Sequence, residues 1–418
     1  MGFLRAYICR MTATTTASSN RSAPARVPTD IAPAYTPVKR AVPVFALAAL
    51  LATGQMYTPI PMFSAMEASW DVGVGAMTWI ISAFAFGYAG GFLLFGPMAD
   101  RFGHKRVLIT GLIAAGVITL LTGLAPSLAV AMPLRVLQGL AIGSIPPAMT
   151  AYATVRIAPE RRAVAIATMV TSFLAATVIG QLASQTVLRF ADWRSVFFGS
   201  AVLFGLVALI ASRIMLPDQR TGTSNLARSY AAIPRVLRIR QLLPMLVAGS
   251  LAMAAMVAVY TGIELTGIVS SSGGLLALRA SALPVMIALP FLAIPLARIP
   301  RPTQVVLGAI IATAAMIAAA FSGDHLVAIA ILLAVLIGGI GIAAPAITQT
   351  AGELGGEHRA AASSVAMFSF YVGATIGPLV ARAAAAHSFA ALAWTLAGML
   401  LVAAGLALWG KRIHPSSE

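Results

Sequence analysis

Long apolar runs alternate with short polar stretches along most of the chain. The runs are about 20 residues long, which is enough for an α-helix to cross a bilayer. The strands of a membrane barrel would instead give short segments of alternating hydrophobicity. The pattern predicts an all-α membrane protein with twelve transmembrane helices, at 41–63, 76–97, 107–125, 128–149, 162–185, 196–216, 242–263, 273–297, 303–322, 325–348, 361–381 and 389–410.

Two similar segments, one in each set of six predicted spans, indicate an internal repeat. Residues 160–182 and 357–379 share a Glu-x-Arg pair and a Phe…Ile-Gly pattern at the same spacing. Two repeats in the same orientation are a transporter architecture, in which the pathway forms at their interface. We therefore expect an N-terminal six-helix half at 41–216 and a C-terminal half at 242–410, joined by a central loop at 217–241.

Composition supports the membrane prediction. The chain of 418 residues is 59% hydrophobic and 10% charged, whereas a soluble domain is about 45–50% apolar and about 25% charged. Residues 1–40 are rich in Ser, Thr, Pro and Arg and poor in acids, so we expect a disordered N-tail there and a short C-tail at 411–418. A single cysteine, Cys9, excludes a disulfide framework and a cysteine metal site.

The positions of Lys and Arg predict the orientation. If both termini are cytoplasmic, only Arg189, Arg194 and Arg382 lie outside, and Arg135 and Arg279 fall within spans. All the other Lys and Arg residues then face the cytoplasm, as the positive-inside rule requires. The net charge of +16 is therefore a topology signal and predicts no nucleic-acid partner. The Ala- and Arg-rich composition suggests a multi-pass protein of a bacterial inner (plasma) membrane.

The segment GPMADRFGHKR (96–106) places charge between the second and third predicted spans. Its notable positions are Gly96, Asp100, Arg101, Gly103, Lys105 and Arg106. Gly103 permits the left-handed backbone of a tight reversal. Asp100 can accept hydrogen bonds at a neighbouring helix N-terminus, where the macrodipole favours an anion. A plain positive-inside loop would explain the basic residues but neither the aspartate nor the glycine spacing.

These six residues fill every position of Gly-x-x-x-Asp-Arg-x-Gly-x-Arg/Lys-Arg/Lys, and the segment thereby resembles the loop signature of the major facilitator superfamily. The resemblance implies the two-half fold predicted above. It also implies a conformational latch that holds the halves outward-facing and releases on inward opening. The corresponding loop of the second half, 295–304, has Arg298 and Arg301 but no acid, so any latch is asymmetric.

RVLQGLAIG (135–143) resembles the Arg-x-x-x-Gly pattern that proton-coupled members of the superfamily carry in span four. A guanidinium inside a span costs about 2.5–3.5 kcal/mol on insertion scales, so such residues usually line a cavity or serve a relay. Arg135 and Gln138 share one helix face. The alternative is a structural arginine that is hydrogen-bonded to the backbone carbonyls of neighbouring helices.

Span five departs from the family pattern. Efflux antiporters of the superfamily usually carry Gly-x-x-x-Gly-Pro-x-x-Gly-Gly there, but 176–184 reads ATVIGQLAS, with Gln181 in place of the proline. A Gly-x-x-x-Gly-Pro element occurs instead in span eleven. Small residues allow helices to approach closely in lipid. We expect helix-packing roles for Gly139, Gly143, Gly180, Gly373, Gly377 and Pro378.

Few polar or aromatic residues fall near mid-membrane, so we expect a weakly polar or amphiphilic substrate. Flexible, polarizable side chains such as Met can adapt to the shape of such a compound. Each aromatic residue could equally serve ordinary helix packing. Candidates for the substrate cavity are Gln55, Tyr57, Arg135, Gln138, Gln181, Gln185, Tyr260, Phe370 and Tyr371. Candidates for proton coupling are Arg135, Glu264 and Asp100, although Glu264, at the outer end of span seven, could simply be solvated.

Other classes of protein lack support. The chain has no His-Glu-x-x-His motif, no Gly-x-Ser-x-Gly elbow and no phosphate-binding Gly-rich loop, so we expect no enzyme activity, cofactor or metal. The resemblance implies a secondary transporter in the lipid bilayer, similar to drug:proton antiporters and sugar-efflux permeases, that exports a drug-like compound or metabolite by proton antiport. We also expect a monomer. The alternatives are uptake or facilitated diffusion of a metabolite or sugar, and a membrane receptor that does not transport.

Overall fold

The structure, a computed structural model, describes residues 35–218, 226–269, 272–296, 298–323, 325–356 and 359–413. Within these ranges the chain is almost entirely helical and has no strand. A helix satisfies its own backbone hydrogen bonds, which a chain in lipid must do because no water is available. The all-α prediction is therefore confirmed. Most of the predicted tails, 1–40 and 411–418, lies outside the described residues.

The first half follows the six predicted spans, and two of them are broken. α1 and α2 meet at a bend of 43° around Pro59 and Pro61, and α5 ends before Pro146 and Pro147, because proline lacks the N–H that a helix interior needs. The helices are α1 (Val38–Tyr57), η1 (Ile60–Met62), α2 (Phe63–Trp70), α3 (Val74–Phe102), α4 (His104–Gly123), α5 (Leu128–Ile142), α6 (Ile145–Arg156), α7 (Pro159–Val187) and α8 (Trp193–Ile214).

The second half has one broken span, between α11 and α12. Its helices are α10 (Leu242–Thr266), α11 (Ser272–Ala280), α12 (Leu283–Leu296), α13 (Arg301–Ala320), α14 (Leu326–Leu354), α15 (Arg359–Ala385) and α16 (Phe389–Ile413). Among the described residues, nine helices are long and apolar enough to cross a membrane, and the bent α1–α2 pair would make a tenth. α7 and the α11–α12 pair occupy the two remaining predicted positions, so the helices are consistent with twelve spans.

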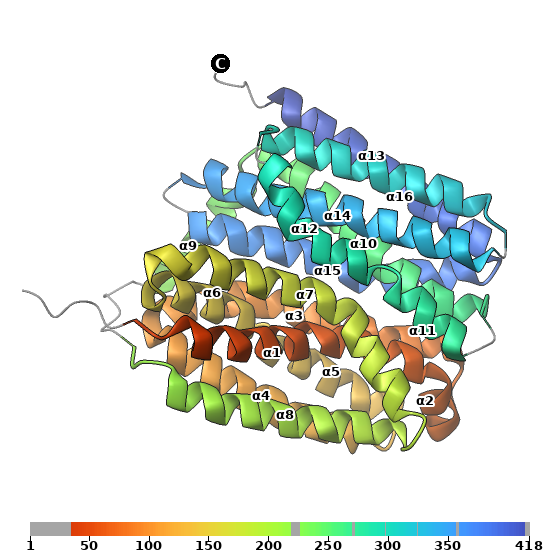
Figure 1. Ribbon diagram of the computed structural model, residues 1–418, viewed down its shortest axis with the longest axis horizontal. Coiled ribbons are helices and arrows are strands. Elements are labelled where there is room, and N and C mark those ends of the chain that lie inside the picture. The colour runs from red at the N-terminus through yellow and green to blue at the C-terminus, as the bar shows by residue number, and fades with distance from the viewer. Residues whose placement is uncertain are drawn as a thin grey trace, which may run out of the picture. The chain divides into compact units, whose positions relative to one another are not determined.

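The two halves lie side by side with their helices roughly along one direction (Figure 1). α1 begins and α16 ends at the same end of this bundle, which we call the termini end, and the opposite end is the distal end. α3 packs along α15, and α7 packs against α11 and α12. Ser82 of α3 donates to the carbonyl of Thr375 of α15 at 2.7 Å, so direct hydrogen bonding joins the halves.

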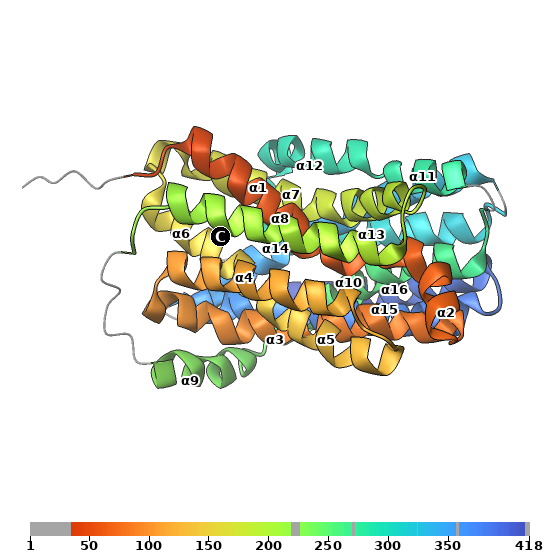
Figure 2. The same cartoon turned by 90° about the horizontal axis from the view of Figure 1, so that it is seen from below.

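The connection expected at 217–241 contains a further helix, α9 (Leu226–Leu237). Its Val236 is buried with Leu246 of α10 and Val365 of α15. On the other side, the hydroxyl of Tyr230 donates to the carbonyl of Leu94 of α3 at 2.7 Å. α9 therefore contacts both halves from the edge of the bundle, where Figure 2 shows it near the termini end.

Glycines set the closest helix approaches inside the first half. A Cβ atom on Gly143 would lie 2.7 Å from the Cα of Gly91, so α3 and the end of α5 are nearly in backbone contact. Gly139 of α5 faces the carbonyl of Phe84 in the same way. Any larger side chain at these positions would push α3 and α5 apart.

Two further helix pairs approach through small residues. A Cβ atom on Gly180 of α7 would lie 2.9 Å from the carbonyl oxygen of Gly54 of α1, and one on Gly377 of α15 would lie 2.6 Å from that of Ala254 of α10. Gly373 of α15 faces the carbonyl of Ser250, one turn earlier on α10. Pro378 lies within α15, directly after Gly377.

Candidate functional site

A buried polar group surrounds Arg135 of α5, which is 0% exposed. Its Nε donates to the carbonyl of Ile80 at 3.2 Å, and its two terminal nitrogens donate to Gln138 Oε1 at 2.6 Å and to the carbonyl of Gln55 at 3.0 Å. The guanidinium also lies 4.5 Å from the ring centroid of Phe84. Its donors therefore point to neutral acceptors and its face points to an aromatic ring.

Gln138 extends this group to other helices. Its amide nitrogen donates to Gln55 Oε1 at 3.1 Å and to Thr119 Oγ1 at 2.7 Å. The Arg135 group thus joins α1, α3, α4 and α5, all of the first half. Within the described part of the chain, no carboxylate forms an ion pair with Arg135.

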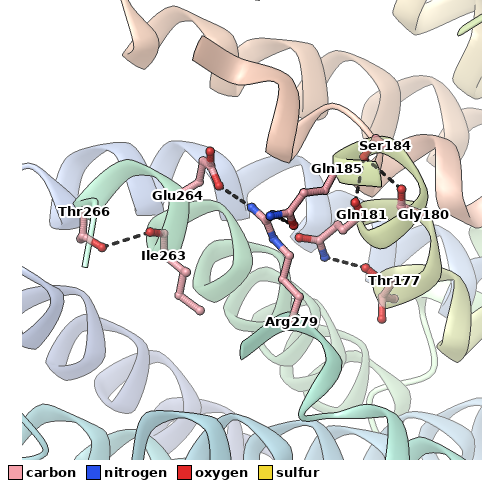
Figure 3. A network of polar contacts seen from close by, with 9 residues as sticks. All are labelled: Thr177, Gly180, Gln181, Ser184, Gln185, Ile263, Glu264, Thr266 and Arg279. Carbon is pink, nitrogen blue, oxygen red and sulfur yellow. Dashed lines mark hydrogen bonds and ion pairs between the residues drawn. The ribbon is translucent and has the colours of Figure 1, made fainter. Parts of the chain in front are cut away.

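A second buried group surrounds Arg279 of α11, which is 1% exposed. One terminal nitrogen donates to Gln185 Oε1 of α7 at 2.7 Å, and the other pairs with the carboxylate of Glu264 of α10. Figure 3 shows the guanidinium between these two partners. Because α7 belongs to the first half and α10 and α11 to the second, Arg279 connects the halves. We call these contacts the Arg279 bridge.

Two polar side chains next to the Arg279 bridge have free atoms. Gln181 donates from Nε2 to the carbonyl of Thr177 at 2.6 Å (Figure 3), and its Oε1 is buried with no partner in the described part of the chain. The hydroxyl of Tyr260 is also buried without a partner in the described structure. The ring of Tyr260 packs edge-on against Tyr57 of the first half, with centroids 6.4 Å apart.

The remaining aromatic candidates lie in different places. Tyr371 of α15 reaches the first half, where its ring centroid is 4.3 Å from that of Tyr88 and 5.3 Å from that of Phe92. Phe370 lies in the hydrophobic core of the second half, against Gly249. The structure therefore brings Tyr371, but not Phe370, to the interface between the halves.

The segment between the second and third spans is shorter than expected. α3 continues through Asp100 and Arg101, and only Gly103 separates it from α4, so the expected loop is a single residue. Gly103 has a φ of 101°, a region that favours glycine. The side chain of Asp100 lies outside the described part of the structure.

The start of α4 is capped by Asp218. Its carboxylate accepts from the backbone N–H of Lys105 at 2.8 Å and of Arg106 at 3.2 Å, at the start of α4. An anion is stabilised there by the free N–H groups and the helix dipole. The Nζ of Lys105 donates to the carbonyls of Ser212 and Met215 at the end of α8. These contacts lie within the first half and the start of the central connection.

Arg101 and Gly96, two other positions of this signature, contact different parts of the molecule. Arg101 is exposed, with its guanidinium 5.8 Å from the ring centroid of Phe102. Gly96 faces the second half, since a Cβ atom there would lie 3.1 Å from the hydroxyl of Ser364 of α15. In the second half, Arg301 at the start of α13 pairs with Glu353 near the end of α14. The acid that the loop 295–304 lacks is therefore supplied by another helix.

Sequence reasoning did not assign Arg279, Thr119 or Asp218 to the site. Arg279 carried a usable signal, because an ionisable residue within a span is a functional candidate by default. Thr119 and Asp218 carried none, since their partners are distant in sequence.

Comparisons with known proteins identify the family. The family model of the Major Facilitator Superfamily matches residues 45–354, most of the described chain. Among curated relatives, the puromycin resistance protein of Streptomyces alboniger is 31% identical over 145 residues, which cover 34% of this chain and 29% of that protein.

Two other relatives also have names that refer to antibiotics. The tetracenomycin C resistance and export protein of Streptomyces glaucescens is 30% identical over 34% of this chain and 26% of its own length. The lincomycin resistance protein of Streptomyces lincolnensis is 28% identical over 48% of this chain and 44% of its own length. The matches thus span between about a quarter and a half of these proteins. From the family match, the chain belongs to the Major Facilitator Superfamily.

Proposed function

We propose that this chain is a secondary active transporter, not an enzyme, that exports a small, weakly polar or amphiphilic organic compound by proton antiport. Family membership supports transport of a small molecule across a membrane. The names of the relatives support export of an antibiotic-like compound. The distribution of Lys and Arg supports an orientation with both termini in the cytoplasm, so that the distal end faces outside. We further propose that the protein is a monomer in the plasma membrane.

The Arg279 bridge is the observation that carries this proposal. Alternating access in two-half transporters requires contacts between the halves that form in one state and break in another. Arg279 is held by Glu264 of its own half and reaches Gln185 of the other half near the distal end. The bridge therefore closes the distal end, and its rupture opens that end.

Glu264 supplies the link to protons. When a proton from outside binds its carboxylate, the ion pair with Arg279 is lost, and the guanidinium is no longer held toward Gln185. The halves then separate at the distal end and substrate leaves. As the halves close again, the proton leaves Glu264 for the interior of the protein and the ion pair with Arg279 re-forms. Opening at the termini end then delivers that proton to the cytoplasm. Arg135, the other buried arginine expected to take part in coupling, bonds to neutral groups of the first half, which supports a structural role for it.

The test uses everted membrane vesicles with the interior acidified and the pH gradient reported by fluorescence quenching. Puromycin, lincomycin and tetracenomycin C, the compounds in the relatives' names, are added in turn. We expect at least one to dissipate the gradient, and Glu264→Gln to abolish that response. Glu353→Gln, at an exposed ion pair of the termini end, is the matched control and should behave as wild type. An unchanged response in Glu264→Gln would remove Glu264 from the mechanism.

A further inference from the structure

Two fully buried polar atoms beside the Arg279 bridge have no hydrogen-bond partner among the residues that the structure describes. They are the Oε1 of Gln181, a residue that is 0% exposed, and the hydroxyl of Tyr260, which is 1% exposed. The orientation of the Gln181 amide is fixed by its neighbour. The carbonyl of Thr177 can only accept, so the amide nitrogen must face it and the oxygen must be the free atom.

The two free atoms occupy equivalent depths on the two halves. Gln181 lies one turn before Gln185 on α7, and Tyr260 lies one turn before Glu264 on α10, so each pair shares a helix face. Both helices run from the termini end to the distal end. Because Arg279 contacts Gln185 and Glu264, both free atoms lie one turn deeper than the bridge, toward the middle of the bundle.

The chemistry of these atoms defines what they can bind. An amide oxygen accepts from an N–H or O–H group, and a phenol hydroxyl can both donate and accept. A buried acceptor left without a donor is costly, so a ligand that supplies the donor is selected over one that does not. The ring of Tyr57 against that of Tyr260 adds an aromatic surface at the same depth.

The charges nearby favour an uncharged ligand. The only acid at this site among the described residues, Glu264, is already paired with Arg279. A ligand ammonium would therefore approach a guanidinium without a free carboxylate to pair with. A ligand carboxylate would lie against the free oxygen of Gln181, which donates no hydrogen bond to it, and the nearby guanidinium of Arg279 is already paired with Glu264.

We propose that Gln181 and Tyr260 form a substrate subsite for the hydroxyl or N–H donor of an uncharged aromatic compound. This assignment rests on the proposed function, because it takes the ligand of the subsite to be the transported compound. Gln181 stands where the efflux signature has proline, which offers no side-chain acceptor, so the subsite depends on this chain's own residue.

Binding of matched probes to the full chain in lipid nanodiscs tests the subsite, with empty nanodiscs correcting for partition into lipid. Equilibrium dialysis compares 2-naphthol, which has a hydroxyl donor, with 2-methoxynaphthalene, which lacks it, and with the cation of 2-naphthylmethylamine. Because an unmade buried hydrogen bond is costly, we expect 2-naphthol to bind about tenfold more tightly than 2-methoxynaphthalene. The cation should bind more weakly than 2-naphthol.

Two variants locate the effect. Gln181→Met keeps an unbranched side chain but removes the free acceptor, so the preference for 2-naphthol over 2-methoxynaphthalene should fall to near unity. Tyr260→Phe keeps the ring beside Tyr57 and should reduce the preference in part. Thr186→Val is the matched control, because Thr186 is exposed on the same helix and donates to the carbonyl of Leu182. It should keep the wild-type preference, and thermal unfolding should show all variants folded.

Any of four results would overturn the assignment. Wild type could bind 2-naphthol and 2-methoxynaphthalene equally, or bind 2-naphthol without saturation. The preference for 2-naphthol could be unchanged in both variants, or the cation could bind more tightly than 2-naphthol. The dialysis involves no pH gradient. Selective binding of 2-naphthol without proton exchange would therefore contradict the proposed antiport and leave the subsite intact. Proton exchange driven by compounds without a donor group would contradict the subsite and leave antiport intact.

Discussion

The two buried arginines, Arg135 and Arg279, differ in what their guanidinium groups contact. Arg135 bonds to carbonyl oxygens and to Gln138, all within the first half. Arg279 pairs with the carboxylate of Glu264 and reaches Gln185 in the other half. Both side chains are almost fully buried, so burial alone does not separate them.

The difference lies in which contacts can respond to a proton or to movement of the halves. The partners of Arg135 are not titratable, and they stay with it when the halves move as rigid bodies. The Arg279 bridge contains a titratable carboxylate and crosses the interface. We therefore expect Arg135 to stabilise the first half and the Arg279 bridge to control the distal end.

Glu264→Gln should give the largest loss of stability. It leaves the buried guanidinium of Arg279 without a counter-ion, and breaking a buried pair in this way typically costs about 3–5 kcal/mol. Unfolding of the purified protein, followed by the fluorescence of its tryptophans, measures the change. The double variant with Arg279→Gln should recover most of the loss, because no unpaired charge remains. A double variant less stable than the single one would contradict this view of the bridge.

Arg135→Met should destabilise the protein less than Glu264→Gln. The variant leaves the buried Gln138 Oε1 without its donor, at a cost of about 1–3 kcal/mol. That cost is partly offset because an unpaired charge no longer has to be buried. The same unfolding measurement compares the two variants, with Arg135→Lys as the variant that keeps the charge. If Arg135→Met were the more damaging, the assumed order of the two arginines would be reversed.

Ser82→Ala should have a smaller effect, and one that does not depend on pH. The hydroxyl of Ser82 donates to the carbonyl of Thr375 across the halves, so this contact joins the halves as the bridge does but contains no charge. Its loss should cost about 1 kcal/mol. Unfolding at pH 5 and pH 8 should show the same decrease relative to wild type, and a strongly pH-dependent decrease would show that this contact also titrates.

Asp218→Asn should have the smallest effect. The carboxylate caps the start of α4, where a negative charge contributes about 0.3–1 kcal/mol, and the asparagine keeps an acceptor. The loss should shrink at high salt, which screens a partly exposed charge. Unfolding in low and high salt measures it. A loss as large as that of Glu264→Gln would show that this contact contributes more than a cap.

The hydrophobic pattern was sufficient to predict the all-α membrane fold, because each apolar run encodes its own helix. The positive φ at Gly103 also agrees with the sequence interpretation, since a reversal there requires glycine. The pattern did not show where three spans break or that α9 forms in the central connection. The helix breaks depend on proline placement and on packing between helices, which hydrophobicity does not record.

The site was less predictable than the fold because its contacts join distant segments. Gln185 and Arg279 lie on different halves, and nothing in either local sequence indicates that they meet. Asp218, which follows α8, accepts the hydrogen bonds at the start of α4, more than 100 residues before it in the sequence, and nothing in its local sequence indicates that contact. Phe370 and Tyr371 are neighbours in sequence, but helical geometry turns one into the core of the second half and the other toward the first.

The most direct test of the account measures a distance across the distal end. Spin labels at Phe190→Cys in the first half and Val327→Cys in the second, both at exposed positions, report on opening in a Cys9→Ser background. Labels at Phe190→Cys and Leu124→Cys, both in the first half, form the control pair.

For the cross-half pair in wild type, we predict a short distance at pH 8 and a longer one at acid pH, where Glu264 takes up a proton. In Glu264→Gln, the longer distance should be found at both pH values. The control pair should not change. Identical cross-half distances in wild type and Glu264→Gln at both pH values would contradict the claim that the Arg279 bridge controls the distal end.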